Sequence, residues 1–168
     1  RSAKPRVVIV QDAFTSFYEP HIVLAARELL ERLGCEVSVS EYLPNGKGMH
    51  VKGFLRRFTK QARRTADALR ALASSGATLV AIEPAVGLTY RDEYRHALGK
   101  DLGFEVLLLQ ELLVRVIPKD AETTVPKKDV APYRLFGHCT EKTLAPASQK
   151  QWVDVFARLG LRLLPVAT

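Results

Sequence analysis

The apolar residues of the chain occur in short uninterrupted runs separated by longer amphipathic stretches. Runs of four or five apolar residues are typical of strands buried on both faces, whereas apolar residues three or four positions apart are typical of helices. This pattern predicts strands at residues 6–11, 78–82, 106–109, 135–139 and 162–164, and the alternation of apolar and polar residues predicts another at residues 36–40. It predicts helices at residues 20–33, 54–74, 87–98, 110–116 and 146–159.

Strands and helices alternate along almost the whole sequence. Such alternation requires right-handed crossovers and a largely parallel sheet. We therefore expect an α/β fold with helices on both faces of the sheet, in Rossmann-like or flavodoxin-like layers. Residues 118–132 are rich in Pro and Lys and predict a linker. It would separate a nearly complete first β-α repeat unit, residues 1–117, from the truncated start of a second, residues 133–168.

Composition narrows the class of protein. The 168 residues are 47% hydrophobic and 26% charged, which is typical of a globular protein. Two cysteines do not make a disulfide framework, and no apolar run approaches the roughly 20 residues of a membrane helix. We expect a cytoplasmic protein whose contact with the inner membrane is at most peripheral. The first residues lack a starting Met and a signal-peptide pattern, which favours a piece of a longer polypeptide.

The positive charge is concentrated in one segment. Residues 46–70 hold eight basic residues and one acid, which accounts for the whole net charge of +7. The helix predicted at residues 54–74 has one apolar and one basic face. Its apolar stripe is Phe54, Phe58, Ala62, Ala66, Leu69 and Leu72, and its basic stripe is Arg56, Lys60, Arg63, Arg64 and Arg70.

Three interpretations of this basic face remain open. It is a solvated surface, a docking surface for an acidic partner, or a source of attraction for an anionic substrate. No aromatic residues interleave with the charges to stack on bases, so we expect no specific nucleic-acid partner.

The sequence Gly46-Lys47-Gly48 has the composition of a phosphate-binding loop without its pattern. A P-loop requires Gly five residues before the Gly-Lys pair and Ser or Thr after it, where this chain has Glu41 and Gly48. The dinucleotide-binding pattern requires a glycine where Val51 stands. We expect an ordinary glycine-rich turn within a loop at residues 42–53.

A cysteine stands at the end of the strand predicted at residues 135–139. Ligands of open α/β sheets bind at the carboxyl ends of the strands, and Gly137 and His138 predict a turn with the Cys139 thiol at its tip. A thiolate there suits a soft metal or an iron–sulfur cluster. Nucleophilic catalysis with His138 is disfavoured, because adjacent residues seldom reach the required side-by-side geometry. Cys35, between a helix and a strand, is expected to be a small buried apolar residue.

Other polar residues favour structural roles. Glu83 follows the strand at residues 78–82, and Arg91 and Tyr94 follow in the next helix. A hydrogen-bond network at this junction is favoured over Glu83 as a general base, because no partner residue supports that role. The histidines lack the spacing of zinc ligands; they are His21, His50, His96 and His138.

Two motifs resemble those of a known family. Glu83-Pro84-Ala85-Val86, followed by Arg91-Asp92-Glu93-Tyr94, is similar to the Glu-Pro-Ser-Cys and Arg-Asp-Glu-Tyr signature of the cysteine-rich, or CCG, domain. Gly137-His138-Cys139 resembles the start of the second copy of the motif in that domain. The domain occurs in heterodisulfide reductases, glycolate oxidase iron–sulfur subunits and large FAD-linked oxidases. The chain most resembles the long bacterial flavin and iron–sulfur oxidoreductases that are similar to D-lactate and D-2-hydroxyglutarate dehydrogenases.

The resemblance implies which residues would bind iron. Family members carry one Cys, then Cys-Cys-Gly, then a final Cys in each of two copies, and these thiolates bind iron–sulfur clusters. In the first copy Ala13, Pro44-Asn45-Gly46 and Val86 replace the cysteine positions, so no cluster is expected there. In the second copy Cys139 is the expected metal ligand in the parent protein, and its companion ligands would lie beyond Thr168.

The resemblance therefore implies a fragment of the C-terminal iron–sulfur region of an FAD-dependent 2-hydroxy acid dehydrogenase. FAD and a [4Fe-4S] cluster would belong to the parent protein, and we expect no cofactor and no catalytic residue in the fragment alone. Expected partners are the flavin and iron–sulfur domains of the same polypeptide and a downstream electron acceptor. The alternative is a non-catalytic interaction module that docks a partner through its basic helix. A third interpretation is an autonomous cysteine-dependent enzyme.

Overall fold

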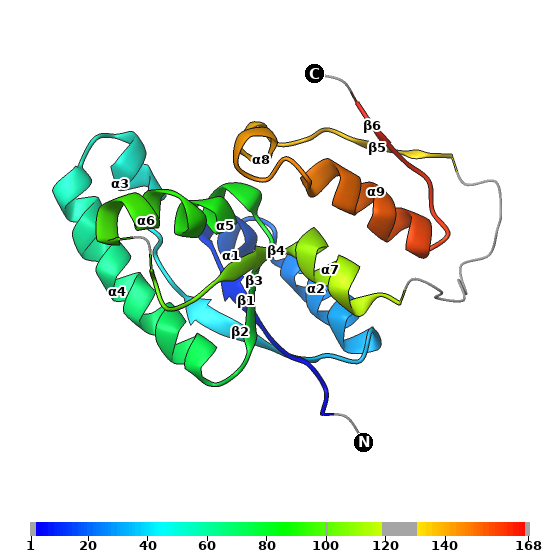
Figure 1. Ribbon diagram of the computed structural model, residues 1–168, viewed down its shortest axis with the longest axis horizontal. Helices are drawn as coiled ribbons and strands as arrows, with labels where there is room; N and C mark the ends of the chain where they lie inside the picture. Colours follow the sequence, from blue (N-terminus) through cyan, green and yellow to red (C-terminus); the bar gives the residue numbers. More distant parts are fainter. Residues whose placement is uncertain (1–2, 100, 119–130, 167–168) are drawn as a thin grey trace. The chain divides into compact units, whose positions relative to one another are not determined.

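The computed structural model describes residues 3–99, 101–118 and 131–166 and divides into two compact units (Figure 1). The first unit is Arg1–Leu108 and the second is Leu109–Thr168. The predicted linker at residues 118–132 lies largely outside the described residues. No helix in the described parts of the chain is long and apolar enough to cross a membrane.

The first unit is built on a parallel sheet of strand order β2-β1-β3-β4. The strands are β1 (Arg6–Gln11), β2 (Glu36–Tyr42), β3 (Thr78–Ala81) and β4 (Val106–Leu108). The central strand β1 pairs with β2 on one side and β3 on the other, so the chain reverses its direction across the sheet between them. In open α/β sheets the crevice at the carboxyl end of such a reversal is the usual place for a ligand.

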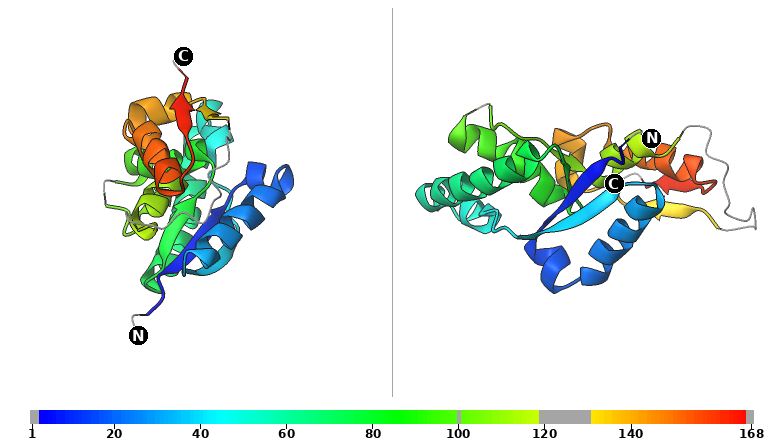
Figure 2. Two further views of the ribbon diagram at one scale, coloured as in Figure 1. Left: turned by 90° about the vertical axis from the view of Figure 1, so that its right-hand side faces the viewer. Right: turned by 90° about the horizontal axis from the view of Figure 1, so that it is seen from below.

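Helices cover both faces of this sheet (Figure 2). They are α1 (Ala13–Phe17), α2 (Pro20–Arg32), α3 (Lys47–Val51), α4 (Leu55–Ser74), α5 (Pro84–Arg91) and α6 (Glu93–Leu98). Alternate side chains of a strand point to opposite faces, and Val8 and Val10 pack in one core cluster with Phe58 of α4 and Tyr90 of α5. The predicted α/β fold with a parallel sheet and helices on both faces is confirmed.

The second unit contains one helix and a partial repeat. Its elements are α7 (Leu109–Val116), β5 (Tyr133–Leu135), α8 (Cys139–Leu144), α9 (Ser148–Arg158) and β6 (Leu163–Pro165). Strands β5 and β6 pair in parallel. The order strand, short helix, longer helix, parallel strand occurs in the first unit as β1-α1-α2-β2 and again as β5-α8-α9-β6. The predicted bounds of the two repeat units, residues 1–117 and 133–168, stay a prediction.

Three short helices and one helix break were not predicted. Helices α1, α3 and α8 have five, five and six residues, too few to show helical periodicity in an apolar pattern. The helix predicted at residues 87–98 is interrupted at Asp92, which ends α5 and precedes α6. The strand predicted at residues 135–139 was wrong, since β5 ends at Leu135.

Candidate functional site

Cys139 is the first residue of helix α8 and not the last residue of a strand. The His138 ring accepts the backbone N–H of Thr140 through Nδ1 at 3.2 Å, and Glu141 Oε2 accepts the backbone N–H of His138 at 3.3 Å. These reciprocal bonds form a capping box, which makes the helix begin at Cys139. The thiol is exposed. A Glu three residues after His138 was the sequence signal for this helix.

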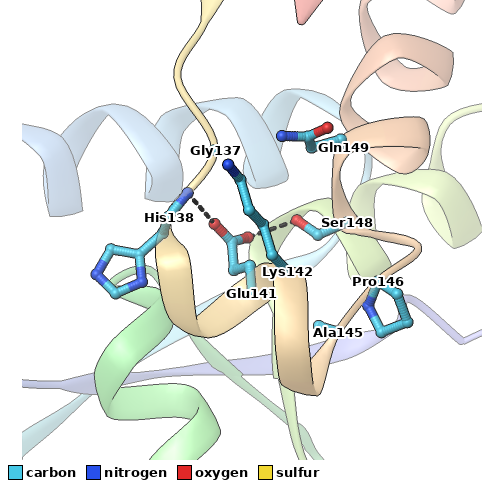
Figure 3. A pocket seen from close by; sticks show the side chains of 8 residues that line it. All are labelled: Gly137, His138, Glu141, Lys142, Ala145, Pro146, Ser148 and Gln149. Carbon is cyan, nitrogen blue, oxygen red and sulfur yellow. Dashed lines mark hydrogen bonds between the residues drawn. The ribbon is translucent and has the colours of Figure 1, made fainter. Parts of the chain in front are cut away.

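The Glu141 carboxylate belongs to a buried polar network in the second unit (Figure 3). Ser148 Oγ donates to Glu141 Oε1 at 2.5 Å, and Gln110 Nε2 donates to Ser148 Oγ at 2.7 Å and to Glu141 Oε1 at 3.3 Å. The network therefore joins α7, α8 and the start of α9, and it fixes the backbone of His138. The adjoining pocket has a volume of about 140 Å³, which is too small for a cofactor. Glu141 therefore positions the start of α8, where Cys139 lies.

The two cysteines have different surroundings. Cys35 is buried, as predicted, and burial raises the pKa of its thiol, which favours an inert packing role. Cys139 presents its thiol to solvent. Within residues 3–99, 101–118 and 131–166, no group of three or more His, Cys, Asp or Glu side chains could hold a metal ion.

The structure brings the three motif positions of the first copy together. Ala13, Pro44-Asn45-Gly46 and Val86 follow β1, β2 and β3, and all of them line one cleft of about 750 Å³. None of these side chains offers sulfur to iron, so the residues present do not fit a cluster in this half. The other residues lining the cleft are Phe14, Tyr42, Lys47, Gly48, Met49, Val51, Lys52, Phe54, Arg57 and Ala85.

Hydrogen bonds from other elements hold the loop at residues 44–46. The carbonyl oxygen of Pro44 accepts from Thr65 Oγ1 at 2.7 Å and from Gln61 Nε2 at 3.0 Å. The Tyr94 hydroxyl donates to the carbonyl oxygen of Asn45 at 2.9 Å. Tyr94 is buried, and the predicted inward packing with a hydroxyl contact is confirmed.

Gly46 and Lys47 have structural roles in this loop. Gly46 has φ +78°, a left-handed conformation that favours glycine, and it precedes helix α3. The Lys47 ammonium pairs with Glu93 of α6. Lys47 is thus engaged by a carboxylate at the position where a phosphate loop would use its lysine.

The residues at the junction after β3 also have structural partners. Glu83 Oε2 caps α5 by accepting the backbone N–H of Val86 at 2.8 Å. Arg91 Nε donates to the carbonyl oxygen of Val106 at 2.9 Å. These bonds agree with the structural network that the sequence favoured over general-base catalysis by Glu83.

Helix α4 separates its apolar and basic residues as predicted. Phe58, Ala62, Ala66 and Leu69 are buried, whereas Phe54 at the N-terminal end is 51% exposed. The Arg57 guanidinium lies 5.7 Å from the centre of the Phe54 ring. The exposed basic residues of the helix are Arg56, Arg57, Lys60, Arg63, Arg64 and Arg70.

The amino-acid sequence of the chain is similar to those of known dehydrogenases. The chain is 46% identical over 162 residues to a D-2-hydroxyglutarate dehydrogenase of Pseudomonas putida, covering 96% of the chain and 16% of that protein. It is 43% identical over 158 residues to the enzyme of the same name from Escherichia coli, covering 94% of the chain and 15% of that protein. The Haemophilus influenzae enzyme of that name is 40% identical over 162 residues.

The alignments cover most of this chain but only a small part of each relative. Nearly all of the chain aligns, yet it spans only about 15% or 16% of the length of these dehydrogenases. No protein-family model and no solved structure matches the chain significantly. The chain is therefore similar to one segment of much longer dehydrogenases.

Proposed function

We propose that this chain is part of the cysteine-rich, or CCG, region of an FAD-linked 2-hydroxy acid dehydrogenase, where it acts as a scaffold and as part of an electron relay. The observation that carries the proposal is the identity of 46% over 96% of the chain to a D-2-hydroxyglutarate dehydrogenase. The flavin of the parent protein would take the hydride, and iron–sulfur clusters would pass the electrons to an acceptor.

Cys139 is the residue we assign to the cluster. Its thiol is exposed at the start of α8, and the capping box and the buried Glu141 network fix the backbone that carries it. Iron–sulfur clusters usually take four cysteine ligands, so the remaining ligands come from outside the described residues. The first unit contributes support and no ligands, because the motif positions at Ala13, Asn45 and Val86 lack sulfur.

Substitution of the two cysteines in the full-length parent protein tests the assignment. Cys139→Ser is expected to lose or distort the [4Fe-4S] signal in the EPR spectrum of the reduced enzyme and to lower its iron content. Cys35→Ala is the matched control and is expected to leave both unchanged, because Cys35 is buried in the first unit. A wild-type spectrum with full iron content in Cys139→Ser would show that Cys139 is not a ligand.

The second candidate function is an interaction module without a redox role. The observation in its favour is the exposed basic face of α4, which carries most of the excess charge. Reversal of Arg56, Lys60 and Arg63 to Glu in the full-length protein distinguishes the two. A loss of partner binding together with unaffected iron content and EPR spectrum in Cys139→Ser would place the interaction module first.

A further inference from the structure

The cleft of the first unit is lined by large apolar side chains that are exposed to solvent. Five of its lining residues are among the exposed large hydrophobic residues of the chain, and Phe17 extends them by packing its ring edge-on against Tyr42 at 5.3 Å. Contiguous apolar patches of this kind mark interaction sites. The five residues and their exposed fractions are Phe14 61%, Tyr42 41%, Met49 37%, Val51 72% and Phe54 51%.

Positive charge begins at this cleft and continues along α4. Lys52 and Arg57 line the cleft. Beyond them, exposed Arg56, Lys60, Arg63 and Arg64 form no ion pair with a described residue. The rise of a helix is about 1.5 Å per residue, so this basic face spans about 12 Å from Arg56 to Arg64. The one acid of the segment, Asp67, pairs with Arg70 at 2.5 Å.

The apolar cleft and the basic face of α4 together define what kind of molecule would bind here. Apolar side chains fit the cleft, and carboxylates fit a basic face that extends about 12 Å from it, roughly two turns of helix. A flat bilayer does not fill a hollow of about 750 Å³ formed by loops after three strands, and a nucleic acid offers no apolar side chains for it. An acidic amphipathic protein segment satisfies both halves of the surface, in the way that helices seat their apolar faces in grooves.

We propose that this cleft binds an acidic amphipathic segment from the part of the parent polypeptide outside these 168 residues. This inference rests on the proposed function in one respect, namely that the chain is part of a much longer protein. The matched relatives are long enough to supply such a segment, since the chain spans 15% or 16% of them. The segment places apolar side chains against Phe14, Val51 and Phe54 and its carboxylates along Arg56, Lys60 and Arg63.

Site-specific photocrosslinking in the full-length protein tests the proposal. A p-benzoylphenylalanine at position 51 is expected to crosslink to one acidic segment outside these residues, identified by peptide mass spectrometry. The triple change Arg56→Glu, Lys60→Glu and Arg63→Glu is expected to lower the yield several-fold, because attraction becomes repulsion along the basic face. The matched control carries the crosslinker at position 24 on α2, where Leu24 is 64% exposed away from the cleft, and it should not label that segment.

Other outcomes overturn the inference. They are crosslinking to lipid, crosslinking to a segment without acidic residues, a yield that charge reversal leaves unchanged, and sedimentation of the full-length protein with phosphatidylglycerol vesicles through this face. The EPR spectrum and iron content of the same samples separate this inference from the proposed function. A failed crosslink with an intact cluster signal rejects the docked segment alone, whereas an absent cluster in the unsubstituted protein rejects the electron relay alone.

Discussion

The two β-α-α-β repeats each start their first helix at a capped turn a few residues after their first strand, and they differ in the side chain that they present there. After β1, Asp12 caps α1 and the first helical residue is Ala13. After β5, His138 caps α8 and the first helical residue is Cys139. The first helical position after the cap therefore carries a methyl group in one repeat and a thiol in the other. In both repeats the N-cap residue fixes the start of the helix, whereas the side chain of the first helical residue decides whether a thiol is present.

The two repeats also differ in how the cap is supported. In the first repeat a single carboxylate caps the helix, because Asp12 accepts from the backbone N–H groups of Phe14 and Thr15 and from the Thr15 hydroxyl. In the second repeat His138 and Glu141 cap the helix together, and Glu141 also accepts hydrogen bonds from Ser148 and Gln110. The second cap therefore depends on tertiary contacts, and its loss should have wider effects.

The largest predicted effect is at Glu141. Glu141→Ala removes the acceptor for Ser148 and Gln110 and leaves buried polar groups unpaired, so the free energy of unfolding should fall by about 3 kcal/mol. Urea denaturation of the chain measures this. Thr143→Ala, at an exposed position on the same helix, serves as the control with little expected change. A loss below about 1 kcal/mol at Glu141 would contradict the structural role of the network.

A smaller loss is predicted at Asp12. Asp12→Ala removes the cap of α1 and should lower the free energy of unfolding by about 2 kcal/mol, at the upper end for N-caps because the Thr15 hydroxyl also loses its acceptor. Asp12→Asn keeps an acceptor oxygen and should recover most of the loss. Thermal unfolding followed by circular dichroism checks both variants. If Asp12→Ala proved more damaging than Glu141→Ala, the contrast between the two caps would be reversed.

Removal of the hydroxyl group should change the free energy of unfolding differently at the two buried tyrosines, Tyr90 and Tyr94. Tyr94→Phe removes the hydrogen bond to the Asn45 carbonyl and should lower the free energy of unfolding by about 1 kcal/mol. Among described residues the Tyr90 hydroxyl has no hydrogen-bond partner, so Tyr90→Phe should be neutral or slightly stabilising. Paired denaturant titrations measure the difference, and equal losses in both variants would refute it.

The smallest predicted effect is the response to alkaline pH. Burial raises the pKa of Tyr90 and Tyr94 well above the usual range, and for Tyr90 the nearby Tyr94, Asp12 and Tyr42 add to it. Above pH 10 the folded state therefore keeps protons that the unfolded state releases, so stability is unaffected below that pH and falls as the pH rises through and above it. The loss at pH 10 should be less than about 1 kcal/mol. Denaturation from pH 8 to 10 measures it, and an equally steep loss in the double Phe variant would exclude the tyrosines as its source.

The long elements were predictable because apolar periodicity determines them. The strands β1 to β4 and the helices α2, α4, α7 and α9 all carry such patterns and lie close to the predicted ranges. The short helices α1 and α8 were missed because fewer than two turns show no periodicity. Their signals were local, namely Asp12 before α1 and His138 with Glu141 at α8.

The cleft could not be read from the sequence, because tertiary structure assembles it. Its walls come from loops after three different strands, and the bond that fixes one of them joins Tyr94 to Asn45 across 49 positions. The resemblance marked Ala13, Asn45 and Val86 as altered positions without indicating that they share a hollow.

The bonds to the Pro44 and Asn45 carbonyl oxygens have a consequence for biogenesis. Donors from Thr65, Gln61 and Tyr94 are supplied by the polypeptide itself, so the shape of this edge is encoded without any contribution from iron. The loop at residues 44–46 therefore takes its shape only once α4 and α6, which follow it in the chain, have folded against it.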